Sequence, residues 1–136
     1  MPNSRRTFVG RETELRADAI TSGDGGKVIV WADEITRYHG NISARGGASG
    51  GNGGFVEVSG KGWLDFSGLV ITLAPSGNAG TLLLDPTNIY IALNQGNATA
   101  AGMSGTDTSA NTGPTPFAAS GAVQDSLLTT GVLMCT

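Results

Sequence analysis

The segment Gly25-Gly26-Lys27-Val28-Ile29-Val30-Trp31 indicates the architecture, because the same pattern recurs twice later in the chain. The two later copies are Gly53-Gly54-Phe55-Val56-Glu57-Val58-Ser59 and Ala79-Gly80-Thr81-Leu82-Leu83-Leu84-Asp85. Each copy has two small residues followed by a short run with apolar side chains at alternate positions. A pattern that recurs at a nearly constant interval of 26–28 residues predicts a repeat architecture, in which each unit packs on the next.

One interval holds about three short strands, near residues 28–31, 35–39 and 41–45, and a glycine-rich corner precedes the first strand of each interval. The strands are rich in Val, Ile, Thr and aromatic residues, and no stretch has a sustained helical spacing of apolar residues. Each corner contains glycine and one Asp or Asn, residue types that favour turns; these are Asp24, Asn52 and Asn78. The sequence therefore predicts an all-β parallel β-helix of about three coils, a single-stranded solenoid with about 4.8 Å between paired strands.

Stacked coils place equivalent side chains in ladders, and alternation along a strand decides which ladders point inward. The two interior ladders expected here are Val28, Val56, Leu82 and Val30, Val58, Leu84. The row between them, which is Ile29, Glu57 and Leu83, faces outward and carries two apolar residues. Trp31 aligns with Ser59 and Asp85 and also points outward, so Ile29, Trp31, Glu57 and Leu83 are the candidate surface-contact residues.

The β-helix is expected to cover residues 7–93 and to begin with an incomplete coil. In that coil, residues 7–9 and 14–16 are expected strands, and residues 19–21 align with residues 41–43 as its last strand. Near the other end, Ile89 continues the position of Ile35 and Trp63. Residues 94–120 have the composition of a low-complexity loop or disordered segment. Residues 121–136 are expected to cap the solenoid with a short helix over 123–129 and a strand over 132–135.

Composition narrows the function classes. The chain has 136 residues, enough for one domain, and 22 of them are glycine, which suits glycine-cornered β structure. A net charge of −3 gives no electrostatic reason to expect a nucleic-acid partner. No apolar run approaches the roughly 20 residues needed to span a bilayer. Residues 1–9 have basic residues without an apolar core behind them, so no signal peptide is expected in this chain.

A catalytic interpretation rests on the outward carboxylates Glu57, Asp65 and Asp85. No short motif fixes the spacing between any two of them, so glycosidase geometry cannot be argued and no enzyme activity is predicted. Arg37 occupies the position equivalent to Asp65, and an exposed pair of these two across adjacent coils would contribute little to stability.

A metal site is not predicted either, and no cofactor is expected. One Asp or Asn per coil is too sparse for a calcium site, so we interpret these residues as corner formers. His39 is the only histidine and has no cysteine partners nearby, which favours a surface or satisfied side chain. Cys135 is likewise alone. Of the two tryptophans, Trp63 lies at a core position and Trp31 is the expected exposed aromatic.

Three segments, in this order along the chain, resemble a known family; they span residues 17–33, 53–61 and 80–89. The first contains Ser22-Gly23-Asp24-Gly25-Gly26-Lys27-Val28-Ile29-Val30, and Leu82-Leu83-Leu84-Asp85-Pro86-Thr87-Asn88 lies in the third. The chain resembles the filamentous-haemagglutinin-like exoproteins of bacterial two-partner secretion systems. The resemblance implies a right-handed β-helix, export through a dedicated outer-membrane pore, and an extracellular or cell-surface location. Because such proteins usually run to many hundreds of residues, we expect this chain to be an internal piece, a truncated reading frame or an excised fragment.

Three functional hypotheses follow. The first is a structural, adhesive β-helix segment that contacts glycans or proteins on host or bacterial surfaces. The alternative is a carbohydrate-active β-helix, either a lyase or hydrolase or a non-catalytic glycan binder. The third is a remnant that folds poorly alone. Because a solenoid with uncovered terminal coils exposes unpaired backbone groups, end-to-end self-association is also expected.

Overall fold

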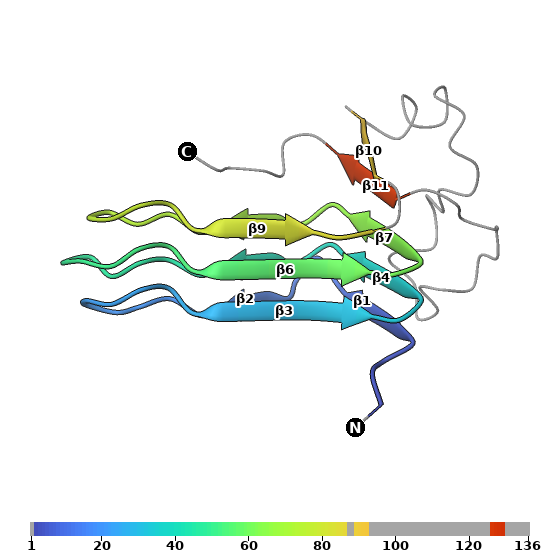
Figure 1. The fold of residues 1–136 in the computed structure, drawn as a ribbon, viewed down its shortest axis with the longest axis horizontal. Coiled ribbons are helices and arrows are strands. Elements are labelled where there is room, and N and C mark those ends of the chain that lie inside the picture. The colour runs from blue at the N-terminus through green and yellow to red at the C-terminus, as the bar shows by residue number, and fades with distance from the viewer. Residues whose placement is uncertain (1, 87–88, 93–125, 130–136) are drawn as a thin grey trace.

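The computed structural model describes residues 2–86, 89–92 and 126–129, which form eleven strands in three parallel sheets (Figure 1). In spatial order, sheet A contains β1 (Arg6–Val9), β4 (Ile35–Tyr38), β7 (Trp63–Phe66), β11 (Ser126–Thr129) and β10 (Ile89–Ala92). Sheet B contains β2 (Glu14–Arg16), β5 (Asn41–Ser43) and β8 (Leu69–Ile71). Sheet C contains β3 (Lys27–Ala32), β6 (Phe55–Gly60) and β9 (Thr81–Leu84).

The register confirms the predicted three-coil parallel β-helix. In sheet C, Lys27 pairs with Phe55 and Phe55 pairs with Thr81, so each strand lies beside the strand one repeat away. The other two sheets repeat this arrangement, β4 pairing with β7 and β5 with β8. Figure 1 shows β3, β6 and β9 stacked as three nearly level strands, with paired loops reaching out beyond one end of each.

The interior is built from the ladders that alternation predicts. Val56 and Val58 of the middle coil are fully buried, and they pack with side chains from sheets A and B. From those sheets the cluster takes Tyr38, Leu64, Phe66, Ile42 and Val70, and Ala44 joins it just after β5. The end coils are less covered: Val28 and Leu82 are only partly buried and pack against this cluster from below and above.

The aromatic pair in this interior is Tyr38 on Phe66, stacked with ring centroids 5.6 Å apart and planes 14° apart. Burial raises the pKa of the Tyr38 phenol above its ordinary value. The Tyr38 hydroxyl is buried and has no hydrogen-bond partner among the described residues, so it carries a desolvation cost that a phenylalanine would not.

Glycine recurs at the corners because neighbouring coils approach too closely there for a side chain. A Cβ added to Gly54 would lie 2.1 Å from the carbonyl oxygen of Gly26. A Cβ added to Gly80 would lie 2.0 Å from the carbonyl oxygen of Gly54. The repeated glycine therefore answers a steric requirement between coils as well as the turn itself.

The strand predicted at residues 19–21 does not form, and that prediction was wrong. β2, at Glu14–Arg16, holds the place beside β5, and Ile20 is 93% exposed. Residues 19–21 instead follow the long corner of the next coil: Ala19 N–H donates to the Arg45 carbonyl, and Ser49 N–H donates to the Thr21 carbonyl. In the first coil, residues 19–21 are thus part of the corner and not of a strand.

The end of sheet A also differs from the prediction. Ile89 does not continue the position of Trp63, because β11 lies between β7 and β10 and pairs with both. The helix expected over residues 123–129 is replaced at Ser126–Thr129 by this strand. A strand inserted there satisfies backbone groups on both of its edges, whereas a helix would leave the edge of β7 unpaired. The expected loop at 94–120 and strand at 132–135 lie outside the described residues.

Candidate functional site

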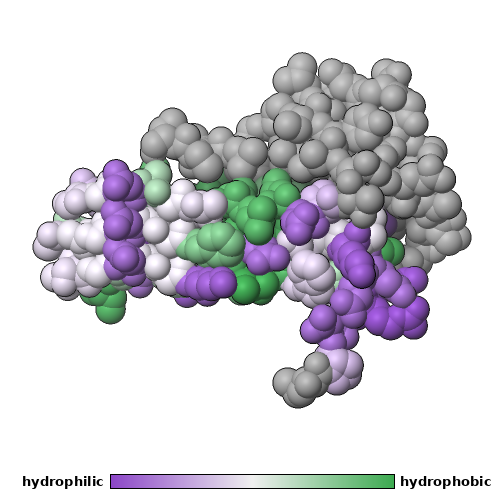
Figure 2. All heavy atoms as spheres, viewed as in Figure 1, coloured by the Kyte–Doolittle hydropathy of each residue, from purple (hydrophilic) through white to green (hydrophobic). Residues whose placement is uncertain are grey.

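The outer face of sheet C collects all four of the predicted surface-contact residues. Its middle row is Ile29, Glu57 and Leu83, in the register that the repeat predicts. Ile29 is 52% exposed and Leu83 is 40% exposed, while Glu57 between them is half-buried. Figure 2, which views this face, shows hydrophobic and hydrophilic residues side by side over its middle. A flat parallel sheet thus presents two large apolar side chains to solvent, one on either side of a carboxylate.

Polar contacts hold the side chains around this row. The Ser59 hydroxyl donates to Glu57 Oε1 over 3.1 Å. The Trp31 indole N–H donates to Asp33 Oδ1 over 3.2 Å, which orients the half-buried ring at the edge of the face. Trp31 therefore points outward as predicted, although it is only partly exposed.

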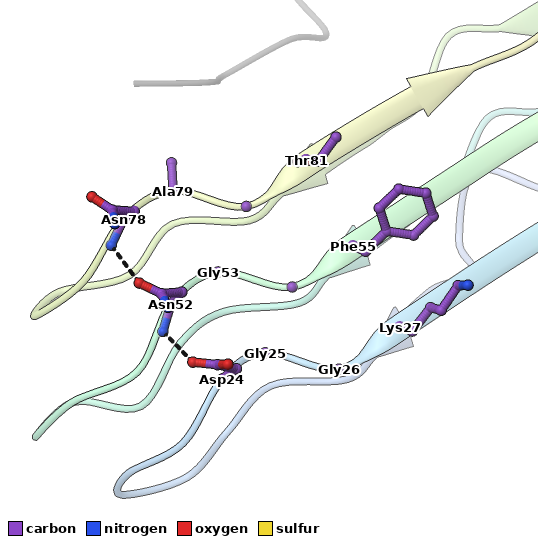
Figure 3. Close-up of a pocket in the computed structure, with 12 residues that line it drawn as sticks. Asp24, Gly25, Gly26, Lys27, Asn52, Gly53, Phe55, Asn78, Ala79 and Thr81 are labelled. Carbon is purple, nitrogen blue, oxygen red and sulfur yellow. Dashed lines mark hydrogen bonds between the residues drawn. The ribbon is translucent and has the colours of Figure 1, made fainter.

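A glycine-floored groove borders this face where the strands of sheet C begin (Figure 3). One wall is the row of corner residues Asp24, Asn52 and Asn78, and the other is Lys27, Phe55 and Thr81. The Lys27 ammonium lies 5.1 Å from the centroid of the Phe55 ring, within range of a cation–π contact. Within the described part of the chain, no three Asp, Glu, His or Cys side chains come together as a metal site.

The corner residues form a directional hydrogen-bond ladder between coils, which we call the corner ladder. Asn52 N–H donates to Asp24 Oδ1 over 2.7 Å, and Asn78 N–H donates to Asn52 Oδ1 over 3.0 Å (Figure 3). The side chains of Asp24 and Asn52 therefore bond to the next coil and not, as corner residues commonly do, to their own backbone.

Asp18 ties the first coil to the second in a similar way. Its Oδ1 accepts from the Ser43 hydroxyl over 2.6 Å and from the Arg45 N–H over 2.8 Å. Burial by itself raises the pKa of Asp18, but the hydrogen bonds from Ser43, Arg45 and Arg16, together with the charge of Arg16, hold it below its ordinary value. The carboxylate is thus a structural acceptor at the junction of two coils.

The outer side of sheet A overturns one prediction. Arg37 and Asp65 are register partners in adjacent coils, as expected, but they are buried, with exposures of 2% and 7%. The carboxylate of Asp65 lies 3.0 Å from Nε2 of His39, which is itself buried. The outward position of a residue on a solenoid does not by itself expose it.

Trp63 is buried, as predicted, but it lies outside the interior cluster. It alternates with Leu64 and Phe66, which belong to that cluster, and the Arg37 guanidinium lies 4.9 Å from its ring. The His39–Asp65 contact was missed by the sequence reasoning. Its only sequence signal is that His39 has the same strand parity as Arg37, the register partner of Asp65.

The three carboxylates considered for catalysis do not share a face. Glu57 belongs to sheet C, Asp65 is buried on sheet A, and Asp85 is an exposed residue just after β9. Two carboxylates working on one glycosidic bond must lie on the same site, about 5–10 Å apart. Asp65 lies on a different face from Glu57, so these two carboxylates do not form such a pair.

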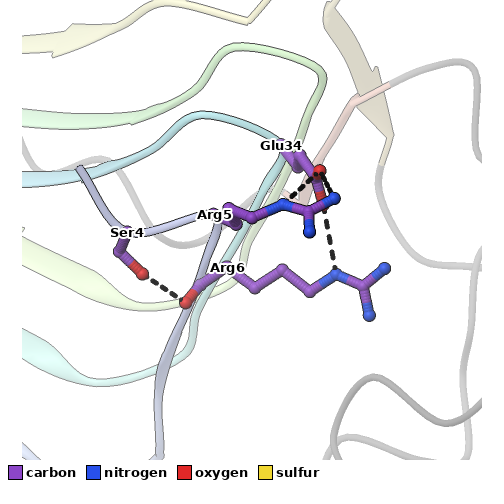
Figure 4. A network of polar contacts seen from close by, with 4 residues as sticks. All are labelled: Ser4, Arg5, Arg6 and Glu34. Carbon is purple, nitrogen blue, oxygen red and sulfur yellow. Dashed lines mark hydrogen bonds and ion pairs between the residues drawn. The ribbon is translucent and has the colours of Figure 1, made fainter. Parts of the chain in front are cut away.

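A charged contact at the start of the chain was also not foreseen (Figure 4). The Arg5 guanidinium contacts the Glu34 carboxylate, and Arg6 Nε lies 3.4 Å from Glu34 Oε2. The hydrogen bond from Arg5 lowers the pKa of Glu34 below its ordinary value. These side chains are exposed, so the contact positions the residues before β1 without contributing much to stability.

Comparison with known proteins does not assign the chain: no family model matches it, and no curated protein matches it. None of the described residues forms a helix long and apolar enough to cross a bilayer.

Proposed function

We propose that this chain is a structural and adhesive β-helix segment of a large secreted bacterial exoprotein, and that the outer face of sheet C is its contact surface. The observation that carries the proposal is the middle row of that face, where Ile29 and Leu83 are exposed on either side of Glu57. Large exposed apolar side chains gathered on one face of a soluble protein are typical of an interaction surface.

The fold supports this function. A parallel β-helix supplies a rigid, extended face whose residues are fixed at about 4.8 Å intervals by backbone pairing. Many weak contacts on such a face add up without further ordering of the chain, which reduces the entropic cost of binding.

The sequence resemblance is the basis for the proposed location, export route and partners. It supports an extracellular or cell-surface location, export of the full-length protein through an outer-membrane two-partner-secretion pore, and surface glycans or proteins of host cells or bacteria as partners. Under this proposal the chain carries out no catalysis.

Binding of the purified chain to bacterial and epithelial cell surfaces tests the proposal. The double variant Ile29→Ser with Leu83→Ser should lower binding at least tenfold, because it removes the apolar part of the row. Ile20→Ser is the matched control, since Ile20 is 93% exposed but lies in the corner beside sheet B. Equal loss in the control, or unchanged binding by the double variant, would contradict the assignment of this face.

A second candidate, a carbohydrate-binding β-helix, is favoured by the half-exposed Trp31 ring and by the groove beside Phe55. A glycan array on the purified chain, with release of reducing ends assayed alongside, separates the candidates. Glycan binding lost in Trp31→Ala, without any release, would favour a non-catalytic glycan binder. Release that requires Glu57, Asp65 or Asp85 would favour a lyase or hydrolase.

A further inference from the structure

The far edge of β9 has no partner strand in the described part of the chain. Sheet C ends at β9, and no other strand among the described residues pairs with its far side. The inward side chains there show the same opening: Leu82 and Leu84 are partly exposed, whereas Val56 and Val58 directly below them are fully buried. Among the described residues, no strand covers the interior of the solenoid beyond β9.

The backbone of β9 presents an extended pairing edge. Thr81 N–H donates to the Gly54 carbonyl, so the backbone groups of Thr81 point toward β6. Because successive residues of a strand direct their N–H and C=O groups to alternate sides, those of Leu82 and Leu84 point to the open side. An unpaired row of this kind is a template for another strand.

The corner ladder ends on the same side with an unused acceptor. Asp24 and Asn52 each receive an N–H from the coil above, and Asn78 is the last member. No described residue donates to Asn78 Oδ1. A strand added above β9 would place its own corner N–H within reach of this oxygen, as Asn78 N–H is placed over Asn52.

The corner also limits what such a strand can contain. In the existing stack, a Cβ at Gly54 would lie 2.1 Å from the Gly26 carbonyl, and a Cβ at Gly80 would lie 2.0 Å from the Gly54 carbonyl. The next strand meets the Gly80 carbonyl in the same way, so it needs glycine at the equivalent position. Two residues further on, and again two residues after that, it needs apolar side chains to cover Leu82 and Leu84.

We propose that the edge formed by β9 and Asn78 is a docking site for one extended polypeptide strand, which adds in parallel to sheet C. The partner segment has the pattern Asn or Asp, small residue, Gly, any residue, apolar, any residue, apolar. Backbone pairing supplies affinity, and the glycine and the two apolar side chains supply specificity.

A whole second copy of the chain does not fit this edge in register. A copy that placed its β3 on β9 would bring its β1 to the level directly above β7. That level is occupied by β11, with β10 beyond it. The end-to-end stacking expected from the sequence is therefore obstructed in sheet A, whereas no described strand lies in the way of a single strand added to β9.

The test uses the full chain and a fluorescent peptide that copies residues 52–60, which match the pattern. Fluorescence anisotropy should show saturable binding. Asn78→Ala should weaken it about two- to tenfold, the loss expected for one hydrogen bond. Asn52→Ala is the matched control and should leave the affinity unchanged, because its bond lies within the stack. A peptide with alanine in place of Gly54 should lose more than tenfold.

Three results would overturn the proposal. The first is the absence of saturable peptide binding. The second is equal binding by the alanine peptide or by the Asn78→Ala protein. The third is concentration-dependent association of the chain alone in sedimentation velocity, lost in Asn78→Ala, which would assign the edge to a second copy.

Discussion

The corner ladder has a direction, so its three members should contribute unequally to stability. Asn52→Ala removes the acceptor 3.0 Å from Asn78 N–H, and Asp24→Ala removes the acceptor 2.7 Å from Asn52 N–H. All three residues are exposed, so a freed N–H turns to water and only the net value of the bond is lost. That value is about 1 kcal/mol for Asn52 and about 1–2 kcal/mol for the charged acceptor Asp24. Asn78→Ala should cost less than about 0.5 kcal/mol, because its side chain accepts nothing within the described stack.

Urea unfolding of the three variants, followed by circular dichroism, measures these differences. The slope of free energy against urea should match that of the unchanged protein, so that midpoints report stability directly. If Asn78→Ala were as costly as Asn52→Ala, the reasoning would be refuted. These residues would then act on the conformation of their own turns, as local hydrogen-bonding Asp and Asn residues do, and not on the next coil.

Three further substitutions test the interior and the acid behaviour of the fold. Val56→Asp places an unpaired charge in a fully buried position and should lower the free energy of unfolding by more than about 4 kcal/mol. Ile29→Asp, on the exposed row, should lower it by less than about 1 kcal/mol. Thermal melting distinguishes the two variants, and similar losses would mean that the inward and outward ladders are misassigned. Tyr38→Phe removes a buried hydroxyl that no described residue hydrogen-bonds, and it should raise the free energy of unfolding by about 1 kcal/mol in urea titrations. A loss of that size would show that the hydroxyl is satisfied in solution. The pKa of Asp18 is lowered in the folded protein, so its stabilising contribution is present above about pH 4 and is lost as the pH falls through the folded-state pKa. Asp18→Asn should therefore flatten the acid side of the stability profile measured between pH 2 and 6, and an unchanged profile would exclude this role.

The repeat made most of the fold predictable. Two glycines followed by alternating apolar residues specify both a corner and an inward ladder. The burial of Val56 and the outward position of Ile29 could therefore be predicted from the sequence alone. The candidate site was predictable for the same reason, because register and strand parity alone place its residues on the outer face; these are Ile29, Trp31, Glu57 and Leu83.

The errors lie where the repeat gives no information. In the first coil, residues 19–21 align in sequence with residues 41–43, but β2 takes the place beside β5 and Ile20 lies exposed in the corner. β11 pairs with β7 across 62 residues, and no local periodicity encodes such a distant pairing. The burial of Arg37, His39 and Asp65 was equally hidden, because parity gives the side of a sheet and not its exposure.

The regular interval between paired strands also has a kinetic consequence. β4 pairs 29 residues after β1, and β6 pairs 28 residues after β3, so each new coil closes a loop of nearly the same modest length. The closure entropy of each step is therefore similar, and every completed coil is a template for the next. A chain that emerges from its amino end could fold progressively, coil after coil, without waiting for distant segments. β11 is the exception, since β7 must wait for residues that follow it by about sixty positions. The slow step of folding should thus be the closure of sheet A, after the three coils have formed.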